Sequence, residues 1–450
     1  MMKEPLKVLI AAFGLSWPLA GAQAQSQPAA PVRHELSVKQ ALEYAARNNV
    51  QVKNALIDVQ IQQQVNREVT SAAYPQVSAT GNFTDNLKLQ TQLLPGEFFG
   101  QPAGTFVPIT FGTKYVTTGA VDVSQILFDG QVFVGLQARK TSIQWKQKNA
   151  EITDETIRAN VYKVYYQLVL SKTQVALLDA NIALIEKLKH DAQIMYENGF
   201  AEKLDVDKND VQLTNLHTEK EKVLVSVANG YNGLKILLGI PVKDQLVLTD
   251  SMNDEQIRSE VLENAGYSYE DRRDYQYLKL SQKLNEFNVK RYQYSKIPTL
   301  SAFFNYNRMN MENDFRFNGQ WFEASYVGLR LSIPIFKGFG TNAKIRQAQL
   351  AVKQTDNQLE NLRNTIDNEV ETAKNTFRSS ISIMDYQKKN MALAETVYNQ
   401  TKKKYEVGTG SQTEINTAQT DLKTAQSNYI SALYDAVVAK VDYLKAVGKL

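Results

Sequence analysis

The chain has 450 residues, roughly three domain lengths and enough for a large core. It contains no cysteine, which excludes disulfide bonds, thiol catalysis and thiolate-bound metal centres. Its 51 Lys and Arg against 47 Asp and Glu leave a net charge of +4, which gives no support for a nucleic-acid partner. With only three histidines, His34, His190 and His217, we expect no bound metal, no cofactor and no catalytic residues, and hence no enzyme.

Residues 1–24 are typical of a secretory signal peptide. Lys3 and Lys7 give a positive start, residues 8–15 form a short apolar core, and residues 22–24 fit the small-residue cleavage pattern. No later stretch approaches 18 consecutive apolar residues, so a membrane-spanning helix is not expected. We therefore expect an exported protein, which could cross a membrane only as a closed β-barrel.

The mature sequence contains two copies of one pattern. The segment Tyr196–Gly199 recurs as Tyr405–Gly408, and Gly239 recurs as Gly448 with the same spacing. Such agreement predicts two structural repeats. We assign residues 25–239 to the first repeat, 240–271 to a linker and 272–450 to the second repeat.

Each repeat is expected to hold one β-hairpin and three helices. Residues alternate in polarity within 76–128 and 299–336, as in β-hairpins, which gives four strands per chain. After each hairpin the period changes to that of a coiled coil, with Leu178, Ile182 and Ile185 on one apolar seam. The expected helices cover residues 37–73, 131–198, 204–238, 272–297, 339–407 and 415–447.

A sheet of four strands cannot stand alone in lipid. Its two edge strands would leave unpaired backbone groups, and each of these is costly where no water is present. Either the sheet is soluble, or several chains contribute four strands each to one barrel. The pattern itself leaves two, three or four chains open.

Several short motifs occur in a fixed order along the chain. They are the segment 36–42, a proline before each hairpin at 75 and 298, a Phe-x-Gly element after each hairpin, a Tyr-x-x-Gly turn in each repeat, and the segment 237–241. In this order and duplication they resemble the TolC-like outer-membrane efflux channel family, over essentially the whole mature chain.

The resemblance implies an α+β membrane protein located in the outer membrane, with a periplasmic extension. It implies a homotrimer whose chains give four strands each to a twelve-stranded β-barrel in outer-membrane lipid, continued by a long α-helical coiled-coil tunnel. It also implies a periplasmic adaptor protein and an inner-membrane pump as partners. The implied function is the exit duct of a tripartite efflux or type I secretion system, a passive conduit that its partners open.

The resemblance further assigns roles to the turns between long and short helices. Asp205, Tyr405 and Glu414 match residues of the periplasmic entrance and its gate. The residues that match tip turns and the adaptor contact are Gly199, Phe200, Gly408 and Thr409.

Two positions depart from the family pattern. Gly410 stands where some members carry a gate arginine, and Thr417 stands where a second entrance acid can occur. We therefore expect no gate held closed by an arginine. We also expect fewer acidic side chains around the entrance than in members that carry the second acid.

Structural interpretations of the same residues stay open. Ser411 and Glu414 also form a capping-box pattern, and Asp205 lies where a carboxylate stabilises the start of a helix. Tyr405 could equally pack at a helix end. A second function also stays open, that of a periplasmic coiled-coil adaptor or structural protein, although an adaptor would usually show one helical hairpin and a membrane anchor.

Overall fold

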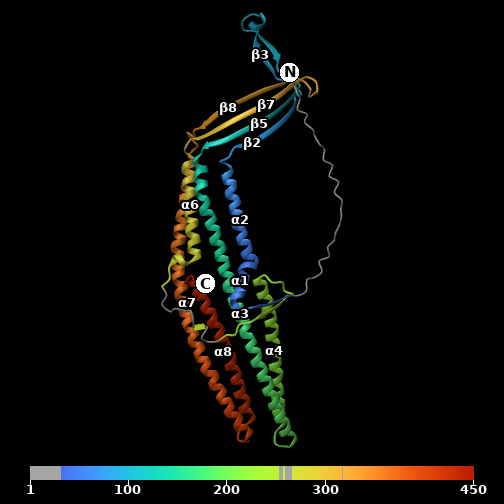
Figure 1. Ribbon diagram of the computed structural model, residues 1–450, viewed down its shortest axis with the longest axis vertical. Helices are drawn as coiled ribbons and strands as arrows, with labels where there is room; N and C mark the ends of the chain where they lie inside the picture. Colours follow the sequence, from blue (N-terminus) through green and yellow to red (C-terminus); the bar gives the residue numbers. More distant parts are fainter. Residues whose placement is uncertain (1–31, 253–256, 259–265, 317) are drawn as a thin grey trace, which may run out of the picture.

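The computed structural model describes residues 32–252, 257–258, 266–316 and 318–450. The expected signal peptide lies outside the described residues, and so does part of the expected linker. The described chain is long, with a β-sheet at one end, helices running away from it, and two helical tips at the opposite end (Figure 1).

Four antiparallel strands form the sheet at one end of the molecule. Their order is β2-β5-β7-β8, so two hairpins that are far apart in the sequence meet through β5 and β7. The edge strands are β2 and β8, one from each hairpin. The strands are β2 (Gln76–Asp85), β5 (Tyr115–Phe128), β7 (Thr299–Glu312) and β8 (Trp321–Ser332).

The two faces of this sheet differ in polarity. Residues that pair directly across antiparallel strands share a face, so the register assigns each side chain to one side. Part of the apolar face is strongly exposed, as Val327 at 78% and Leu329 at 68% show. One row on the apolar face is Val77, Val123, Phe304 and Val327, and the next row, on the polar face, is Ser78, Asp122, Asn305 and Tyr326.

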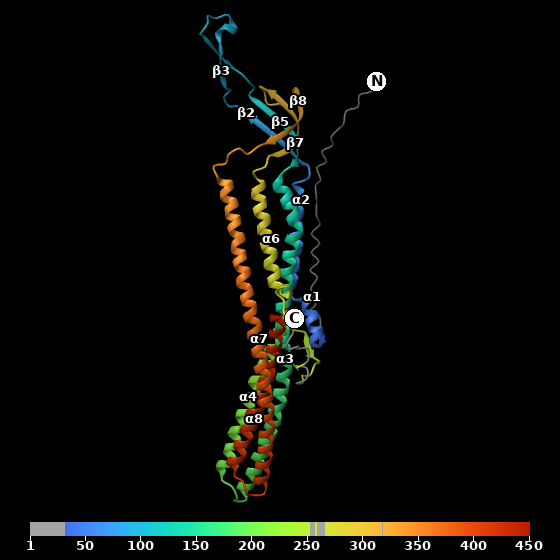
Figure 2. The same ribbon diagram turned by 90° about the vertical axis from the view of Figure 1, so that its left-hand side faces the viewer.

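A small second hairpin projects from the first. It consists of β3 (Thr91–Pro95) and β4 (Phe106–Thr110), joined through the 3-10 helix η1 (Gly96–Phe99). It extends beyond the end of the four-stranded sheet (Figures 1 and 2).

Two helices of nearly equal length run through the helical part. They are α3 (Gly130–Glu197), with 68 residues, and α7 (Gly340–Glu406), with 67. Shorter helices lie against their upper and lower halves. Those of the upper half are α2 (Val50–Ser71) and α6 (Arg273–Tyr294), and those of the lower half are α4 (Lys203–Leu238) and α8 (Gln412–Ala446).

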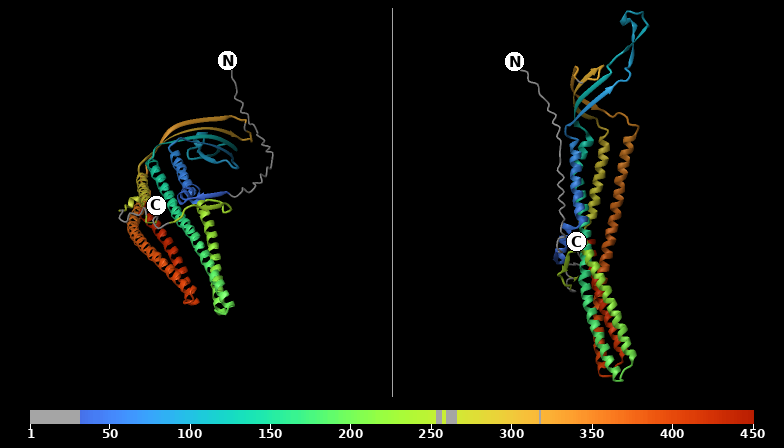
Figure 3. Two further views of the ribbon diagram at one scale, coloured as in Figure 1. Left: turned by 60° about the horizontal axis from the view of Figure 1, so that its bottom comes forward. Right: turned by 90° about the vertical axis from the view of Figure 1, so that its right-hand side faces the viewer.

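The helices form a single layer rather than a bundle. Helix contacts follow the order α2-α3-α6-α7 in the upper half and α4-α3-α8-α7 in the lower half. Helices α6 and α8 therefore occupy the same slot between α3 and α7, one above the other (Figures 1 and 3). Because β2 follows α2 and β8 leads into α7, the sheet and the helical layer end on the same two sides.

Local sequence decides where several helices begin and end. The Asp129 side chain caps α3 by accepting a hydrogen bond from the Gln131 amide at 2.8 Å. Helix α4 ends at Gly239, whose φ of 74° lies in the left-handed region. A Cβ at Gly239 would lie 2.5 Å from the Asn48 carbonyl oxygen, so this close approach requires glycine.

The expected single helix over residues 37–73 is wrong. The chain forms α1 (Val38–Asn48) and α2, with a break at Asn49. The Asn49 side chain accepts hydrogen bonds from the Gln51 and Val52 amides and donates to the Leu237 carbonyl at 2.7 Å. One buried amide therefore starts α2 and ties it to the end of α4.

A two-stranded parallel sheet lies beside the middle of the helical layer. It pairs β1 (Arg33–Leu36) with β6 (Gln245–Leu248), and β6 falls within the expected linker. Four residues per strand are too few for a readable alternation, and the two strands lie more than 200 positions apart, so the polarity pattern did not indicate this pairing. Together with α1 it lies on one side of the layer (Figure 2).

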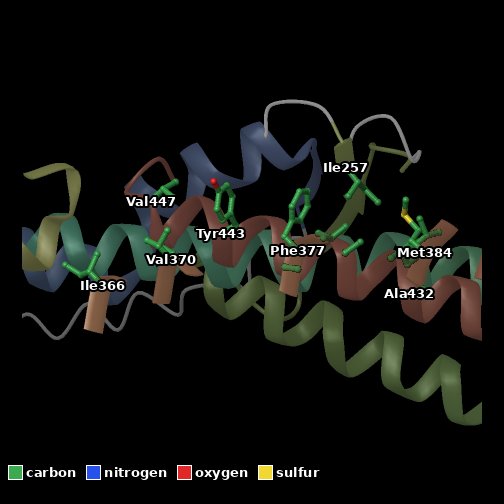
Figure 4. Packing of buried hydrophobic residues seen from close by; sticks show 14 of the residues in the cluster. Ile257, Ile366, Val370, Phe377, Met384, Ala432, Tyr443 and Val447 are labelled. Carbon is green, nitrogen blue, oxygen red and sulfur yellow. The ribbon is translucent and has the colours of Figure 1, made fainter. Parts of the chain in front are cut away.

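Apolar clusters hold the layer together. The largest joins α7 and α8 around Ile366, Val370 and Phe377, and the Phe377 and Tyr443 rings stack there at 6.2 Å (Figure 4). A cluster near the tips contains the seam residues Leu178, Ile182 and Ile185, all 7% exposed or less.

One described helix, α3, is long and apolar enough to cross a membrane by length and composition alone. The core helix of a soluble assembly passes the same test, and α3 packs against α2, α4, α6 and α8. We therefore treat it as the central helix of the layer.

Candidate functional site

The two helical tips end in the same backbone motif. Gly199 and Gly408 both have a φ of 76°, which favours glycine, and each closes a long helix. The Gly199 amide donates to the Tyr196 carbonyl at 3.0 Å, and the Gly408 amide donates to the Tyr405 carbonyl at the same distance. With the next amide of each turn bonding one residue further back, both tips are Schellman turns.

The side chains that follow the two glycines are exposed. Phe200 is 79% exposed, which is unusual for an aromatic ring in water. Thr409 is exposed as well, and its hydroxyl donates to the Lys404 carbonyl at 3.2 Å. The tips therefore present one apolar ring and one polar turn.

Tyr405 and Asp205 are brought together at the tips, although they come from different helical hairpins. The Tyr405 hydroxyl donates to the Met195 sulfur at 3.9 Å. Burial raises the pKa of Tyr405, and the negative charges of Asp205 and Asp191 raise it further. The Tyr405 hydroxyl therefore keeps its proton to a higher pH than an exposed tyrosine does.

Glu414 has a different environment. Its backbone amide donates to the Ser411 side chain at 3.2 Å, which is the first half of the expected capping box. The Glu414 carboxylate lies 3.9 Å from the Lys404 ammonium group, and Asp205 lies 3.4 Å from Lys208. Each of these two carboxylates therefore has a lysine beside it.

The two departures from the family pattern have different settings. A Cβ at Gly410 would lie 3.0 Å from the Tyr405 backbone nitrogen and 3.1 Å from the Lys404 carbonyl carbon. The turn is therefore tight around this position, and a larger residue would require a shift of the backbone. Thr417 is exposed and donates to the Thr413 carbonyl at 2.9 Å.

A hollow of about 270 Å³ lies between α3 and α7 beside Tyr405. Its charged lining combines Lys187 and Asp191 of α3 with Lys402 and Glu406 of α7. Charges of both signs balance there, so the hollow itself has no strong preference for cations or anions.

A layer of buried amides joins the two helical hairpins, and sequence reasoning missed it. Gln419 is fully buried; its amide group donates to Asn181 at 3.3 Å and accepts a hydrogen bond from Gln212. Asn181 also donates to Gln426 at 3.0 Å. The available signal was Asn181 itself, a polar residue within the apolar seam of α3.

A second charged hollow, of about 820 Å³, lies where the start of α6 meets the end of α8. Arg272 is only 8% exposed, and it binds Asp274 at 2.7 Å, Glu369 at 2.9 Å and the Ala446 carbonyl at 3.0 Å. Beside it, Glu155 is 8% exposed, and burial raises its pKa more than the nearby charges lower it. Within the described residues, no group of three or more His, Asp or Glu side chains could hold a metal ion.

Comparison with known proteins places these features in context. The sequence model of the family described as "Outer membrane efflux protein" matches residues 270–449. The chain is 20% identical over 337 residues to the "Outer membrane protein TolC" of Vibrio cholerae, which covers 74% of this chain and 77% of that protein.

Solved structures share the fold over most of its length. The CusC structure, described in connection with transmembrane channel formation, gives a TM-score of 0.75 at 17% identity and covers 91% of this chain and 92% of CusC. The outer membrane protein VceC of Vibrio cholerae gives 0.70 at 12% identity and covers 91% and 96%. The resemblance to the TolC-like outer-membrane efflux channels, predicted from the order of its motifs, is thus confirmed for this chain.

Proposed function

We propose that this protein is the outer-membrane exit duct of a tripartite efflux or type I secretion system. Three copies would form a passive conduit, with a twelve-stranded barrel in the outer membrane and a helical tunnel in the periplasm. A periplasmic adaptor and an inner-membrane pump would engage the tips and open them. No catalytic chemistry is needed for this function.

The observation that carries this proposal is the matched pair of open edges. The sheet ends in β2 and β8, and the helical layer ends on the same sides, in α2 and α4 and in α7. Because all neighbouring strands are antiparallel and the sheet has four strands, β8 runs opposite to the β2 of a next copy. Head-to-tail repetition of one chain would close both layers into a ring.

Exposed apolar side chains on the two helical edges support the same arrangement. On α4, Leu204, Val211 and Val225 are 55–63% exposed and recur at multiples of seven residues. The opposite edge, α7, exposes a corresponding stripe. Its members are Ile383, Tyr386, Leu393 and Val397, at 48%, 69%, 63% and 44%.

The polarity of the sheet supports its place in a membrane. Its apolar face would contact lipid, and its polar face would line the interior of the barrel. The tips then lie at the far, periplasmic end of the molecule. There Asp205, Tyr405 and Glu414 would form the entrance and its gate, while the exposed Phe200 and Thr409, held by Gly199 and Gly408, would contact the adaptor.

Cell fractionation followed by gel migration without boiling tests this proposal. We expect the protein in outer membranes and, before boiling, at the mass of a trimer. A monomer in the soluble periplasmic fraction would instead support the alternative, a periplasmic coiled-coil adaptor or structural protein, because the sheet would then need no closure.

A further inference from the structure

Five exposed cations gather on α6, on α7 and on the segments that join these helices to the four-stranded sheet. Within the described residues none of them forms an ion pair. They line two neighbouring hollows, in which Glu286 is the one acidic side chain among the described residues. The chain as a whole is nearly neutral, so this is a local excess of positive charge. The cations are Lys290, Lys296, Lys337, Arg346 and Lys353.

Three of these cations line one groove between α6 and α7. This groove, of about 580 Å³, is formed by Lys290, Arg346 and Lys353, with Val289 and Val352 as its apolar part. We call it the basic groove. Cations around an apolar strip suit an anionic amphiphile better than a fully hydrated ion.

The other two cations line a hollow of about 260 Å³ closer to the sheet, where β8 passes into α7. Lys296 and Lys337 lie there beside strongly exposed apolar side chains. Ile335 is 93% exposed, and the Phe336 and Phe339 rings, 72% and 73% exposed, meet edge to face at 5.3 Å. This mixture of aromatic rings and lysines is typical of the boundary between lipid chains and headgroups.

The basic groove lies on the outer face of the proposed tunnel. Arg346, Lys353 and Asp367 are separated by multiples of seven residues, so they share one stripe of α7. The Asp367 carboxylate accepts hydrogen bonds from Tyr267 at 2.6 Å and from Tyr269 at 2.9 Å. These tyrosines lie just before α6 and pack against this stripe of α7. The wall of the proposed tunnel is one helix thick, so chain packed against its inner face would obstruct the tunnel.

We propose that this surface binds anionic phospholipid headgroups of the inner leaflet of the outer membrane. This inference rests on the proposed function, which places the sheet in the outer membrane. The exposed aromatic rings would then lie at the level of the headgroups, the two upper lysines would meet phosphate groups, and the basic groove would hold the headgroup of an anionic lipid. Basic residues next to a membrane attract anionic lipids in this way.

The test compares lipid retention by the full-length protein and by a triple variant, Lys290→Gln, Arg346→Gln and Lys353→Gln. Both proteins are reconstituted in vesicles of equal parts phosphatidylcholine and phosphatidylglycerol, extracted in mild detergent, and weighed with their bound lipids by native mass spectrometry. We expect the unaltered protein to retain phosphatidylglycerol over phosphatidylcholine. In the triple variant the ratio of retained phosphatidylglycerol to phosphatidylcholine should fall by roughly tenfold or more, since each basic residue near the membrane surface adds to the attraction.

A matched control removes three exposed cations from the lower helices, Lys222→Gln, Arg378→Gln and Lys389→Gln. These positions would lie far from the membrane, so the control should keep its lipid preference. Raising the salt concentration during extraction should weaken the preference of the unaltered protein, because exposed charges are screened.

Four results would overturn the proposal. Equal retention of both lipids by the unaltered protein, or the same loss in the control, would show that the groove does not select anionic lipid. Loss of binding to isolated peptidoglycan in the triple variant, with unchanged lipid preference, would assign the groove to the cell wall. Failure of the unaltered protein to insert as a trimer would refute the proposed function itself, and this inference with it.

Discussion

At the tips, each acidic side chain of the candidate entrance lies beside a lysine. Asp205 lies 3.4 Å from Lys208, and Glu414 lies 3.9 Å from Lys404. The Glu414–Lys404 pair is exposed and the Asp205–Lys208 pair is partly exposed, so both are screened by water and leave part of the negative potential in place. In a threefold arrangement six carboxylates would surround one narrow mouth, whose low-dielectric walls strengthen their field.

Replacing both Asp205 and Glu414 by Ala tests the role of these charges. We expect a modest cation preference in the unaltered pore and a weaker one in the variant, measured as reversal potentials in planar bilayers under a salt gradient. Trimer yield should change little, because each negative charge lost from the first turn of a helix costs about 0.3–1 kcal/mol. An unchanged cation preference would show that these acids only stabilise their helices.

The buried carboxyl of Glu155 gives a prediction about pH. Its pKa is raised above the ordinary value of 4.5 in the folded protein, chiefly by burial, so the folded state favours the protonated form. Below 4.5 the group is protonated in both states, and above the raised pKa it is ionised in both. The protein should therefore lose stability as the pH rises from about 4.5 through the raised pKa.

The Glu155→Gln variant should lack this loss. We expect its melting temperature, relative to that of the unaltered protein, to increase over the same pH range, as followed by circular dichroism in detergent. A constant difference at every pH would show that Glu155 does not titrate differently on folding.

At the scale of the helices, the apolar seam of α3 decides whether the tips hold together. Leu178 is 4% exposed and belongs to the cluster that joins both hairpins. The Leu178→Asp variant buries an unpaired carboxylate, which costs several kcal/mol. We expect a sharp drop in assembled trimer on gels run without boiling.

The control for this variant must lie on an exposed face of the same helix. The heptad pattern suggests Lys189, but the Lys189 ammonium group lies 2.5 Å from the Asp210 carboxylate, so its replacement would remove an ion pair. Ala183 is exposed, and Ala183→Asp should leave trimer yield nearly unchanged. Equal effects of Leu178→Asp and Ala183→Asp would mean that the seam has been assigned to the wrong face.

The buried amide layer gives a second prediction at this scale. Gln419→Ala removes partners from Asn181 and Gln212, and a buried amide without a partner costs about 1–3 kcal/mol. We expect a lower midpoint of unfolding in urea, whereas Thr417→Ala, on the exposed side of the same helix, should have little effect. Similar midpoints for both variants would show that water replaces the lost hydrogen bonds.

Long elements with a regular apolar period could be predicted from the sequence, whereas short elements and polar contacts could not. A coiled-coil seam and the scarcity of Gly and Pro after Leu136 favoured one long helix, and α3 runs from Gly130 to Glu197. The break at Asn49 depends on a hydrogen bond to a residue 188 positions away, which no local pattern contains. The β1–β6 pairing and the amide layer are also long-range contacts.

The candidate site shows the same division. Glycine-closed turns at Gly199 and Gly408 follow from local chemistry, because both residues have a positive φ. The approach of Asp205 to Tyr405, and the lysines beside Asp205 and Glu414, depend on how two separate hairpins pack. The family resemblance identified these residues as candidates, but it could not predict which side chains lie beside them.

At the scale of the whole molecule, one chain leaves both of its layers open. The sheet ends in β2 and β8, and exposed apolar stripes mark the outer helices on the same two sides. Three copies joined head to tail would remove every free edge, and this closure is what turns an open layer into a duct.

Disulfide crosslinking between the edge strands tests this closure most directly, because the natural sequence contains no cysteine. Ala79→Cys on β2 is combined in turn with Ser325→Cys, Val327→Cys or Leu329→Cys on β8, all exposed on the same face of the sheet. In isolated outer membranes we expect at least one pair to give covalent dimers and trimers, with no larger species, on non-reducing gels. Covalent dimers alone, or crosslinking only within one chain, would contradict a threefold, head-to-tail barrel.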